Sequence, residues 1–566
     1  MVKELNIVEQ LREERLIGVN KGEIPEWMTT HGYMTFKNKY VYEDATVRST
    51  FERIAKSAAK YTNQYEAEAE DWFFKLLWNG WLAPSTPVLA NMGTDRGCPV
   101  SCSGGVVGDS IHGFYSAQLE AAMLSKNGFG TSNYLGDIRG RGERISKGGK
   151  ASGVKPVFKD FVQVSRDVSQ GNQRRGAWAG YLDIDHPDFY EVVDHLAANP
   201  DDLNIGWNIS RNFINRLDYG DKDALMRWQR ALKVKCITGK GYFVKIDHMN
   251  EANPPMYKAH NLSVKASNLC TEIALHADEN HTFTCVLSSM NASKYDEWKN
   301  TDAVFWATVF LDCVAEEFIQ IGKNISGLEK AVRFTQKGRA LGLGLLGYHT
   351  YIQSKMIPFE DSGDINKEIF SYLDRESLRA SQWMAQEFGE PEWCKGYHVR
   401  NTHRIAVAPN TTSALVCGGV SQGIEPVPEI VYVQPSSAGE LERINPVFLE
   451  FAKERGRWNK TLFKDILKNN GSVQHLDWLT EHEKRVFKTA FEIDQYSILK
   501  LASDRQVFID QAQSINLFFD ADASEQHISA VHKYGMKDER IKSLYYMRSK
   551  AGIKAAEESV CEACEG

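Results

Sequence analysis

Several features that would assign a chain to a special class are missing from these 566 residues. No apolar run reaches the length of about 18 residues that a transmembrane helix requires, and the N-terminus, MVKELNIVEQLREERL, lacks the apolar core of a secretion signal. Lys and Arg (67) do not outnumber Asp and Glu (74), so nothing predicts bulk attraction to a nucleic-acid backbone. These absences predict a cytoplasmic protein that binds neither membrane nor nucleic acid.

Cysteine is also scarce, with 10 residues in the whole chain. This number is too small for a disulfide scaffold, and a reducing compartment keeps most thiols free. A disulfide formed there is expected to be transient and catalytic, so the position of each cysteine is more informative than their number. The sequence has no internal repeat and no low-complexity segment.

The pattern of apolar residues predicts three regions. Residues 1–80 have helical spacing, as in YEAEAEDWFFKLLWNGWL, and residues 435–540 are charged and helix-rich. Between them, amphipathic stretches such as 155–170 and 295–322 alternate with strand-like CVLSSMN, RIAVAPNTTS and GYFVKID, which favours an α/β fold with parallel strands. We therefore expect a helical region at 1–80, a catalytic α/β domain at 81–548 and a flexible tail at 549–566.

The stretch SNLCTEIALH, residues 267–276, places an amide, a thiol and an acid on alternate positions. If the segment is a strand, Asn268, Cys270 and Glu272 share one face. Polar groups of this kind are rarely buried together without a hydrogen-bonding partner. A carboxylate can take a proton from a substrate hydroxyl and an amide can orient that hydroxyl, so the row is a candidate catalytic site.

Two further cysteines, Cys102 and Cys285, lie in segments that are candidates for chemistry, although a free cysteine is most often a small buried hydrophobe. That packing role is accepted for four others, and Cys98 is ambiguous because it is close to Cys102. The four are Cys236, Cys313, Cys394 and Cys417.

Near the C-terminus, Cys561 and Cys564 form a C-x-x-C motif. Half of a zinc site is one interpretation, but a structural zinc site needs four ligands and no second pair is present. An inert pair is another. A dithiol on a mobile arm can instead exchange with a disulfide inside an active site and swing out to be reduced again.

Taken together, these segments resemble the catalytic (alpha, large) subunit of class I ribonucleotide reductase. The resemblance covers residue 20 or so to the end, in the family's order. It is carried by NLCTEI, CVLSSMN, the upstream SC…GDS, SLYYMRS, the terminal C-x-x-C, PSTPVLANMG (84–93), SQGNQRRGAWAGYLDIDHPDF (169–189), RALGLGLLGY (339–348) and APNTTSALVCGGVSQGIEPV (408–427).

The resemblance implies a ten-stranded α/β barrel of two parallel five-stranded halves with a finger loop through its centre. Cys270 at the loop tip carries a thiyl radical that abstracts the ribose 3′-hydrogen. Glu272 takes the 3′-hydroxyl proton and Asn268 binds the substrate hydroxyls. Cys102 and Cys285 help to expel the 2′-hydroxyl as water and become a disulfide.

The tail cysteines would then reduce that disulfide and would themselves be reduced by thioredoxin or glutaredoxin. The substrates implied are ribonucleoside diphosphates. The resemblance implies no covalently bound cofactor and no metal ligands in this chain, because a separate small (beta) subunit supplies a metal-dependent radical cofactor.

Tyr545 and Tyr546 distinguish the class, although an arbitrary Tyr-Tyr pair is most often ordinary packing. In SLYYMRS they resemble the pair that passes a radical from the small subunit to Cys270. Adenosylcobalamin-dependent (class II) enzymes generally lack this pair, and the glycyl-radical motif of class III is absent here. A class II enzyme and a C-x-x-C redox-relay or metal-binding protein stay as alternatives.

Nucleotide sites follow from the same resemblance. APNTTSALVCGG would offer hydroxyls and free N–H groups to a diphosphate if a helix begins there, although an ordinary helix cap explains it equally well. The implied substrate contacts are Thr86, Ser101, Asn410, Thr411, Thr412 and Ser413.

A deoxynucleoside triphosphate or ATP, bound with Mg²⁺ at a homodimer interface, would act as specificity effector. The implied effector residues are Asp109, Arg139, Gln170 and Arg174, where a solvated basic loop is the simpler explanation for Arg139. Because only about 80 residues precede PSTPVLANMG, we also expect no N-terminal ATP cone and no dATP inhibition through one.

Overall fold

The computed structural model describes residues 2–43, 46–146, 148–168, 170, 176–202, 204–436 and 439–550. The predictions made for Arg174, Cys561 and Cys564 fall outside these residues.

The N-terminal region is helical, as its apolar spacing predicts. The capping box of Thr46 and Ser49 starts the third helix, whose apolar face is buried. The segment 65–82, predicted as one helix, ends at Trp78, because Gly80 takes a positive φ of 65° and the chain then enters the first strand. The elements are α1 (Val2–Asn20), α2 (Thr30–Lys39), α3 (Val47–Ala59), η1 (Asn63–Tyr65), α4 (Glu66–Trp78) and α5 (Thr86–Asn91).

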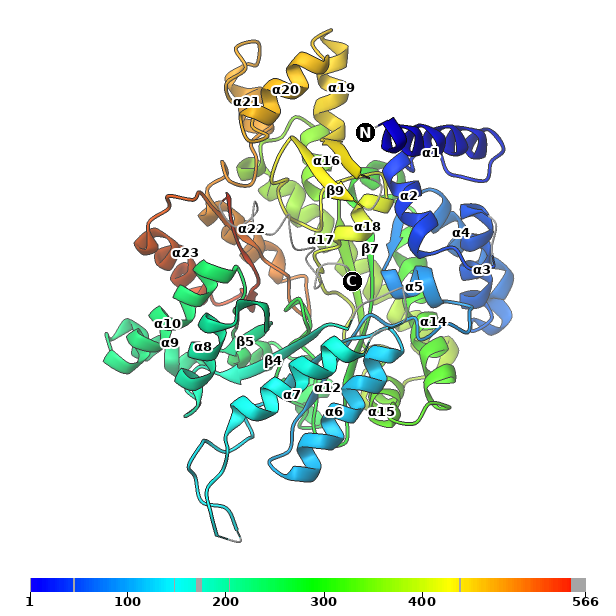
Figure 1. The fold of residues 1–566 in the computed structure, drawn as a ribbon. Coiled ribbons are helices and arrows are strands. Elements are labelled where there is room, and N and C mark those ends of the chain that lie inside the picture. The colour runs from blue at the N-terminus through cyan, green and yellow to red at the C-terminus, as the bar shows by residue number, and fades with distance from the viewer. Residues whose placement is uncertain are drawn as a thin grey trace.

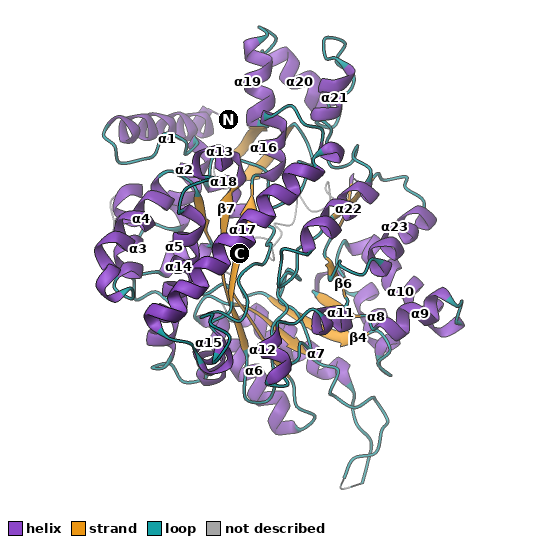
Figure 2. Cartoon of the chain, turned by 180° about the vertical axis from the view of Figure 1, so that it is seen from behind, coloured by secondary structure: helices purple, strands orange, loops and turns teal. Residues whose placement is uncertain are grey.

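A nine-stranded sheet forms the centre of the molecule, with helices on its outside (Figure 2). Its order is β1-β7-β2-β3-β4-β5-β6-β12, and β8 pairs with β7. The five strands from β2 to β6 are parallel to one another. The strands are β1 (Leu82–Pro84), β2 (Cys102–Val106), β3 (Gly130–Tyr134), β4 (Trp178–Asp183), β5 (Ile205–Asn208), β6 (Tyr242–Val244), β7 (Phe283–Asn291), β8 (Leu341–Leu346) and β12 (Ser543–Leu544).

The first half of the predicted barrel is therefore present as five parallel strands. The second half continues from β7 to β8 in parallel, and then through single parallel bridges from Leu343 to Ile405 and from Val407 to Gln513. Strand β7 joins the two halves because it runs antiparallel to β2. The edge strands β1 and β12 are also antiparallel to their neighbours.

Connecting helices cover the sheet (Figure 1). The predicted helical stretch 295–322 is divided at Asn300, which has a positive φ of 64°. The helices are α6 (Ile111–Lys126), α7 (Val154–Asp167), α8 (Phe189–Ala198), η2 (Pro200–Asp202), α9 (Arg211–Asp218), α10 (Lys222–Thr238), α11 (Ile246–Glu251), α12 (Pro255–Ala259), η3 (Ala292–Lys294), α13 (Tyr295–Trp298), α14 (Ala303–Gly322), α15 (Glu329–Gly338), α16 (Tyr348–Ser354), η4 (Phe359–Asp361), α17 (Gly363–Phe388) and η5 (Glu392–Cys394). None of the helices described combines the length and apolarity that a membrane span requires.

The C-terminal part is mostly helical, but the described residues 435–436 and 439–444 correct the prediction. They lie in an antiparallel pair of strands, whose charged residues resemble a helix surface in sequence. The elements are α18 (Thr411–Val416), β9 (Val431–Ser436), β10 (Gly439–Ile444), α19 (Pro446–Glu454), α20 (Lys460–Lys468), α21 (Glu481–Val486), α22 (Gln495–Gln506), β11 (Leu517–Phe519), α23 (Glu525–Lys537) and β13 (Met547–Ser549).

Candidate active site

Residues 267–275 form a loop inside the barrel and not a strand. The chain turns at Thr271, whose φ of 68° is unusual for a β-branched residue. Strands on one side hold the loop through a hydrogen bond from Ser132 Oγ to the Ser267 carbonyl (2.7 Å). From the second half, where Gln513 bridges to Val407, Ser514 Oγ donates to the Cys270 carbonyl (2.5 Å). The loop tip is thus fixed between the two halves of the barrel, and the expectation of a finger loop is confirmed.

Asn268 and Glu272 meet across this turn. The amide Nδ2 of Asn268 donates to Glu272 Oε1 at 2.8 Å and lies 3.4 Å from Cys102 Sγ. Ser514 Oγ donates to Glu272 Oε2 at 3.0 Å. Burial raises the pKa of Glu272 to about 7, against which the hydrogen bonds from Asn268 and Ser514 act. The acid is therefore poised to exchange a proton near neutral pH.

Cys102 and Cys285 stand opposite each other on the antiparallel strands β2 and β7. Opposed residues in such a pair have Cα atoms roughly 4.5–5.5 Å apart, which is within the range that a disulfide spans. Both side chains are buried. Burial, and next the nearby Cys102, raise the pKa of Cys285 well above its ordinary value, so this thiol is neutral. The two cysteines are distant in sequence, and the pairing of β2 with β7 brings their thiols together near the loop.

Tyr545 contacts the thiol at the tip of the loop and packs against Tyr546. Its hydroxyl donates to Cys270 Sγ at 3.3 Å, and its ring centroid lies 4.2 Å from that of Tyr546. Arg548 lies over the Tyr546 ring, 4.9 Å from its centroid. The predicted pair is therefore in contact, and its inner member touches the predicted radical thiol.

Two buried lysines fasten the tyrosine segment. Lys235 Nζ donates to the Tyr545 carbonyl and, at 2.9 Å, to the Gly241 carbonyl. Lys542 Nζ donates to the Gln511 carbonyl at 2.6 Å. These hydrogen bonds lie in a buried site where no water competes for them, and burial lowers the pKa of Lys235 to about 7 and that of Lys542 to about 8. They hold the Tyr545 segment in register with the loop.

Sequence reasoning missed several residues that position this site. Tyr242 lies with its ring centroid 4.7 Å from Tyr545, but its segment was interpreted only as a strand. Tyr181 donates to the Asn268 carbonyl, and the Ala274 N–H donates to Gln511 Oε1 at 3.1 Å. No motif in the sequence marks these contacts, because they depend on which strands become neighbours.

The predicted phosphate segment does begin a helix. Asn410 takes a positive φ of 58° immediately before α18, and its Nδ2 donates to Ser289 Oγ at 2.9 Å. Ser413 Oγ donates to the Pro84 carbonyl at 3.1 Å, two residues from Thr86 at the start of α5. The hydroxyl of Thr86 is 3.0 Å from that of Tyr40. The start of α18, which was predicted, therefore adjoins the start of α5, which was not.

The remaining predicted substrate contacts occupy the same region in part. Thr411 Oγ1 donates to Gln422 Oε1 at 3.0 Å, and Thr412 is buried. Ser101 is buried directly before Cys102 on β2. The contact residues thus lie beside the dithiol on one side and at α18 on the other.

The predicted effector residues fall in two places. Arg139 Nε pairs with Asp109 Oδ2 at 2.5 Å, at the start of α6. These two residues bind each other here, whereas the sequence assigned them separate ligand contacts. Gln170 lies elsewhere, with Nε2 3.1 Å from Asn91 Oδ1 and 3.3 Å from the Arg96 carbonyl.

The other cysteines pack as expected. Cys313, Cys394 and Cys417 are buried and Cys236 is partly buried. Burial raises the pKa of Cys98 to about 12, so that ambiguous thiol is neutral and unreactive as well.

A buried dithiol, a third thiol in contact with a tyrosine pair and an acid with a pKa near 7 together define a thiol-based oxidoreductase built on an α/β barrel. Comparison with known proteins agrees. A model of the ribonucleotide reductase barrel domain matches residues 100–227, 215–398 and 392–547, and one of the ribonucleotide reductase all-alpha domain matches residues 27–97.

Individual relatives point the same way. The alpha subunit of the class Id ribonucleotide reductase of Actinobacillus ureae has 37% sequence identity and a TM-score of 0.87, over 93% of this chain and 98% of its own. A Frog virus 3 (isolate Goorha) protein, provisionally described as a ribonucleoside-diphosphate reductase large subunit, is 34% identical over 84% of this chain and 86% of its own. A vitamin B12-dependent reductase of Thermoplasma acidophilum is less similar, with 27% identity over 90% of this chain and 69% of its own.

The chain belongs to the ribonucleotide reductase large-subunit family. Its activity is that of a ribonucleoside-diphosphate reductase, an oxidoreductase of deoxyribonucleotide synthesis, and it is of the class I type. Such a subunit works with a small partner subunit.

Proposed function

We propose that Cys270 performs the first chemical step as a thiyl radical that takes the 3′-hydrogen of the bound ribonucleotide. A ribose C–H bond has no useful acidity, so a radical and not a base must open it. The observation that carries this assignment is the hydrogen bond of 3.3 Å between the Tyr545 hydroxyl and Cys270 Sγ, at the tip of a buried loop. Burial also protects the radical from water and stray reductants.

Glu272 would accept the proton of the 3′-hydroxyl, and Asn268 would hydrogen-bond to the substrate hydroxyls. Their mutual contact of 2.8 Å holds the carboxylate in one orientation before substrate arrives. The Asn268 amide contacts both Glu272, the proposed proton acceptor, and Cys102 Sγ, part of the proposed reductant.

Cys102 and Cys285 would supply the two electrons of the reduction. The C2′–O bond breaks and its oxygen leaves as water, a C2′–H bond forms, and the two thiols give up two protons and two electrons as a disulfide forms between them. Their opposed positions on β2 and β7 support this pairing. Cys561 and Cys564 would reduce the disulfide, and thioredoxin or glutaredoxin would reduce the tail.

Tyr546 and Tyr545 would carry the radical inward from the small subunit to Cys270. The small subunit would generate that radical with its own metal-dependent cofactor. Ring centroids 4.2 Å apart favour transfer between the two tyrosines. The pair therefore also favours the class I mechanism over the adenosylcobalamin-dependent alternative.

The substrate diphosphate would bind at the starts of α18 and α5, which the Ser413–Pro84 hydrogen bond brings together. Helix N-termini offer free N–H groups to phosphate. The proposed contacts are Thr86, Ser101, Asn410, Thr411, Thr412 and Ser413.

A deoxynucleoside triphosphate or ATP, with Mg²⁺, would bind near the Asp109–Arg139 pair and open it, because Arg139 would then contact the phosphates. Gln170 and Arg174 would relay its identity to the substrate base.

An exposed apolar stripe on α6 supports a homodimer beside this effector site. Ile111, Tyr115 and Leu119 follow one another at helical spacing and are 70%, 60% and 63% exposed. Adjacent large apolar side chains of this kind mark association surfaces. The stripe begins two residues after Asp109, so the dimer interface and the effector site would be neighbours.

We further propose a helical region at 1–80, a catalytic domain at 81–548, a redox tail at 549–566 and a cytoplasmic location.

Replacing Glu272 by glutamine tests the base assignment. Turnover should fall roughly 10²- to 10⁴-fold, the usual contribution of a general base. Wild-type turnover should also decline as the pH falls below about 7, because the carboxyl must be ionised to accept a proton. The matched control is Glu120→Gln, a partly buried glutamate whose pKa is also raised but which lies outside the site, and this variant should keep wild-type turnover. An unchanged rate in the Glu272 variant would refute the assignment.

The same variant should be more stable above neutrality. A raised carboxyl pKa favours folding below about pH 4.5, and that contribution disappears as the pH rises through about 7. Glutamine mimics the neutral acid, so Glu272→Gln should gain on the order of 3 kcal/mol in the free energy of unfolding at pH 8. Denaturant unfolding at pH 5 and pH 8 measures the difference.

A further inference from the structure

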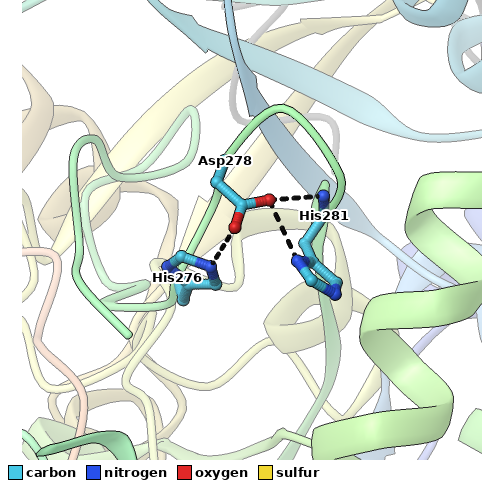
Figure 3. Close-up of side chains that lie close together, drawn as sticks. All are labelled: His276, Asp278 and His281. Atoms are coloured by element: carbon cyan, nitrogen blue, oxygen red, sulfur yellow. Dashed lines mark hydrogen bonds and ion pairs between the residues drawn. The ribbon is translucent and has the colours of Figure 1, made fainter. Parts of the chain in front are cut away.

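A histidine–aspartate–histidine cluster lies beyond the active site, where the sequence predicted no metal ligands. His276 Nε2 is 3.0 Å from Asp278 Oδ2, and His281 Nδ1 is 2.9 Å from Asp278 Oδ1 (Figure 3). One potential ligand atom from each residue lies within 4.8 Å of the other two. All three come from the short segment HADENH, so little chain entropy is lost in bringing them together.

The cluster stands at the base of the loop that carries Cys270. His276 pairs with Val264 in an isolated antiparallel bridge, so the strands entering and leaving the loop meet there. After His281 the chain enters β7, which carries Cys285. A ligand that holds these three side chains together would therefore hold in place both the base of the Cys270 loop and the start of β7, which bears Cys285.

The carboxylate is held in place independently of the histidines. Asp278 Oδ1 accepts the backbone N–H groups of Asn280 and His281, both at 2.8 Å. Its Oδ2 faces only His276 among the hydrogen bonds of the described residues. The fixed carboxylate thus has one imidazole nitrogen beside each of its oxygens, and imidazole nitrogen and carboxylate oxygen are ligand types that Zn²⁺ binds in proteins.

The outer nitrogen of His276 has the partners that a metal ligand needs. Ser263 presents its carbonyl at 2.9 Å and its N–H at 3.1 Å to His276 Nδ1. When Nδ1 carries the proton and donates to the carbonyl, Nε2 presents a lone pair toward Asp278 Oδ2. Two lone pairs facing each other at 3.0 Å repel, and a cation between them turns that repulsion into attraction. In the other tautomer Nε2–H donates to Asp278, so a proton and a metal ion compete for one position.

The surroundings exclude water on one side and admit a cation on the other. The indole of Trp393 packs against both imidazoles, with centroids 6.1 Å from His276 and 5.3 Å from His281. The histidine side chains are 5% and 12% exposed, whereas that of Asp278 is 37% exposed. An incoming ion can therefore meet the carboxylate first and lose its water to the histidines.

We propose that His276, Asp278 and His281 bind one divalent transition-metal ion of the Zn²⁺ type, with a fourth position left to water, and that this ion clamps the base of the Cys270 loop. Imidazole and carboxylate ligands favour such an ion over Ca²⁺ or Mg²⁺, which prefer oxygen ligands alone. The site takes no part in electron transfer and is independent of the roles proposed for the thiols.

The test uses the full chain with C561S and C564S, because tail thiols would also bind zinc. After equilibration with Zn²⁺ and desalting, this parent should retain about one Zn²⁺ per chain, and Zn²⁺ should raise its Tm. D278N, which keeps an oxygen to accept the turn N–H groups, should lose both effects. H281Q should do the same and serves as the second variant if D278N fails to fold.

The matched control is H475Q, since His475 also pairs with a carboxylate, Asp465 Oδ2 at 2.8 Å, but the described part of the chain offers no third ligand there. It should retain the parent's Zn²⁺. The parent should also bind Co²⁺ with visible d–d bands and without the ultraviolet charge-transfer band of a thiolate. A thiolate band, no uptake by the parent, or equal uptake by the parent, D278N and H281Q would overturn the proposal and leave the cluster as a hydrogen-bonded network.

Discussion

Replacing Cys270 by serine should reduce CDP reduction to background while leaving fold and substrate binding unchanged. A serine hydroxyl is close in size to a thiol, but its O–H bond is too strong for a tyrosyl radical to oxidise. The backbone of residue 270 keeps a contact that does not depend on the thiol, since Ser514 Oγ donates to its carbonyl at 2.5 Å. The loop should therefore keep its conformation in the variant. Turnover with the small subunit measures the loss of CDP reduction, and the affinity for CDP measures whether substrate binding is kept.

The control for this variant is Cys394→Ser, which changes another buried cysteine outside the site. It should retain turnover, although a buried serine can lower Tm. Comparable loss in both variants would mean that buried thiols matter for packing and not for chemistry. Residual multiple turnover in Cys270→Ser would contradict the thiyl mechanism directly.

Replacing Tyr546 by phenylalanine should abolish turnover with the small subunit and leave CDP binding intact. Phenylalanine preserves the ring that packs 4.2 Å from Tyr545, but it has no O–H bond to oxidise. The radical could then not reach Cys270. Stopped turnover with an unchanged CDP dissociation constant is the expected result.

Tyr295→Phe is the matched control, because Tyr295 is also buried and its hydroxyl donates to Glu368 at 2.9 Å. Tyr295 is not part of the proposed radical pathway. It should retain turnover. Activity of Tyr546→Phe restored by adenosylcobalamin, without the small subunit, would show instead a class II mechanism.

The sequence indicated which residues meet at the candidate site better than it indicated their geometry. Alternation placed Asn268, Cys270 and Glu272 on one face of a strand, whereas the turn at Thr271 lets the amide and the acid bond to each other and turns the thiol toward Tyr545. A positive φ at a β-branched residue cannot be expected from local propensity, because the surrounding barrel imposes it. The alternating pattern therefore identified the residues of the site, but they meet through a turn and not through a shared face of a strand.

Long-range pairing was similarly out of reach. Cys102 and Cys285 were candidates separately, but their pairing from the residues alone needs the register of β2 against β7. Tyr242 was missed because a strand residue gives no sign of which aromatic ring it will meet. Residues 439–444 were interpreted as part of a helix-rich region because their charged residues suit either structure, whereas they form strand β10.

The central claim is that Cys102 and Cys285 are the direct reductant of the substrate. Its most direct test is a single turnover by the prereduced C561S/C564S chain with the small subunit and CDP, without external reductant. Peptide mapping should find close to one Cys102–Cys285 disulfide for each dCDP formed. Product formed while both thiols stay reduced, or a disulfide that joins other cysteines, would contradict the account.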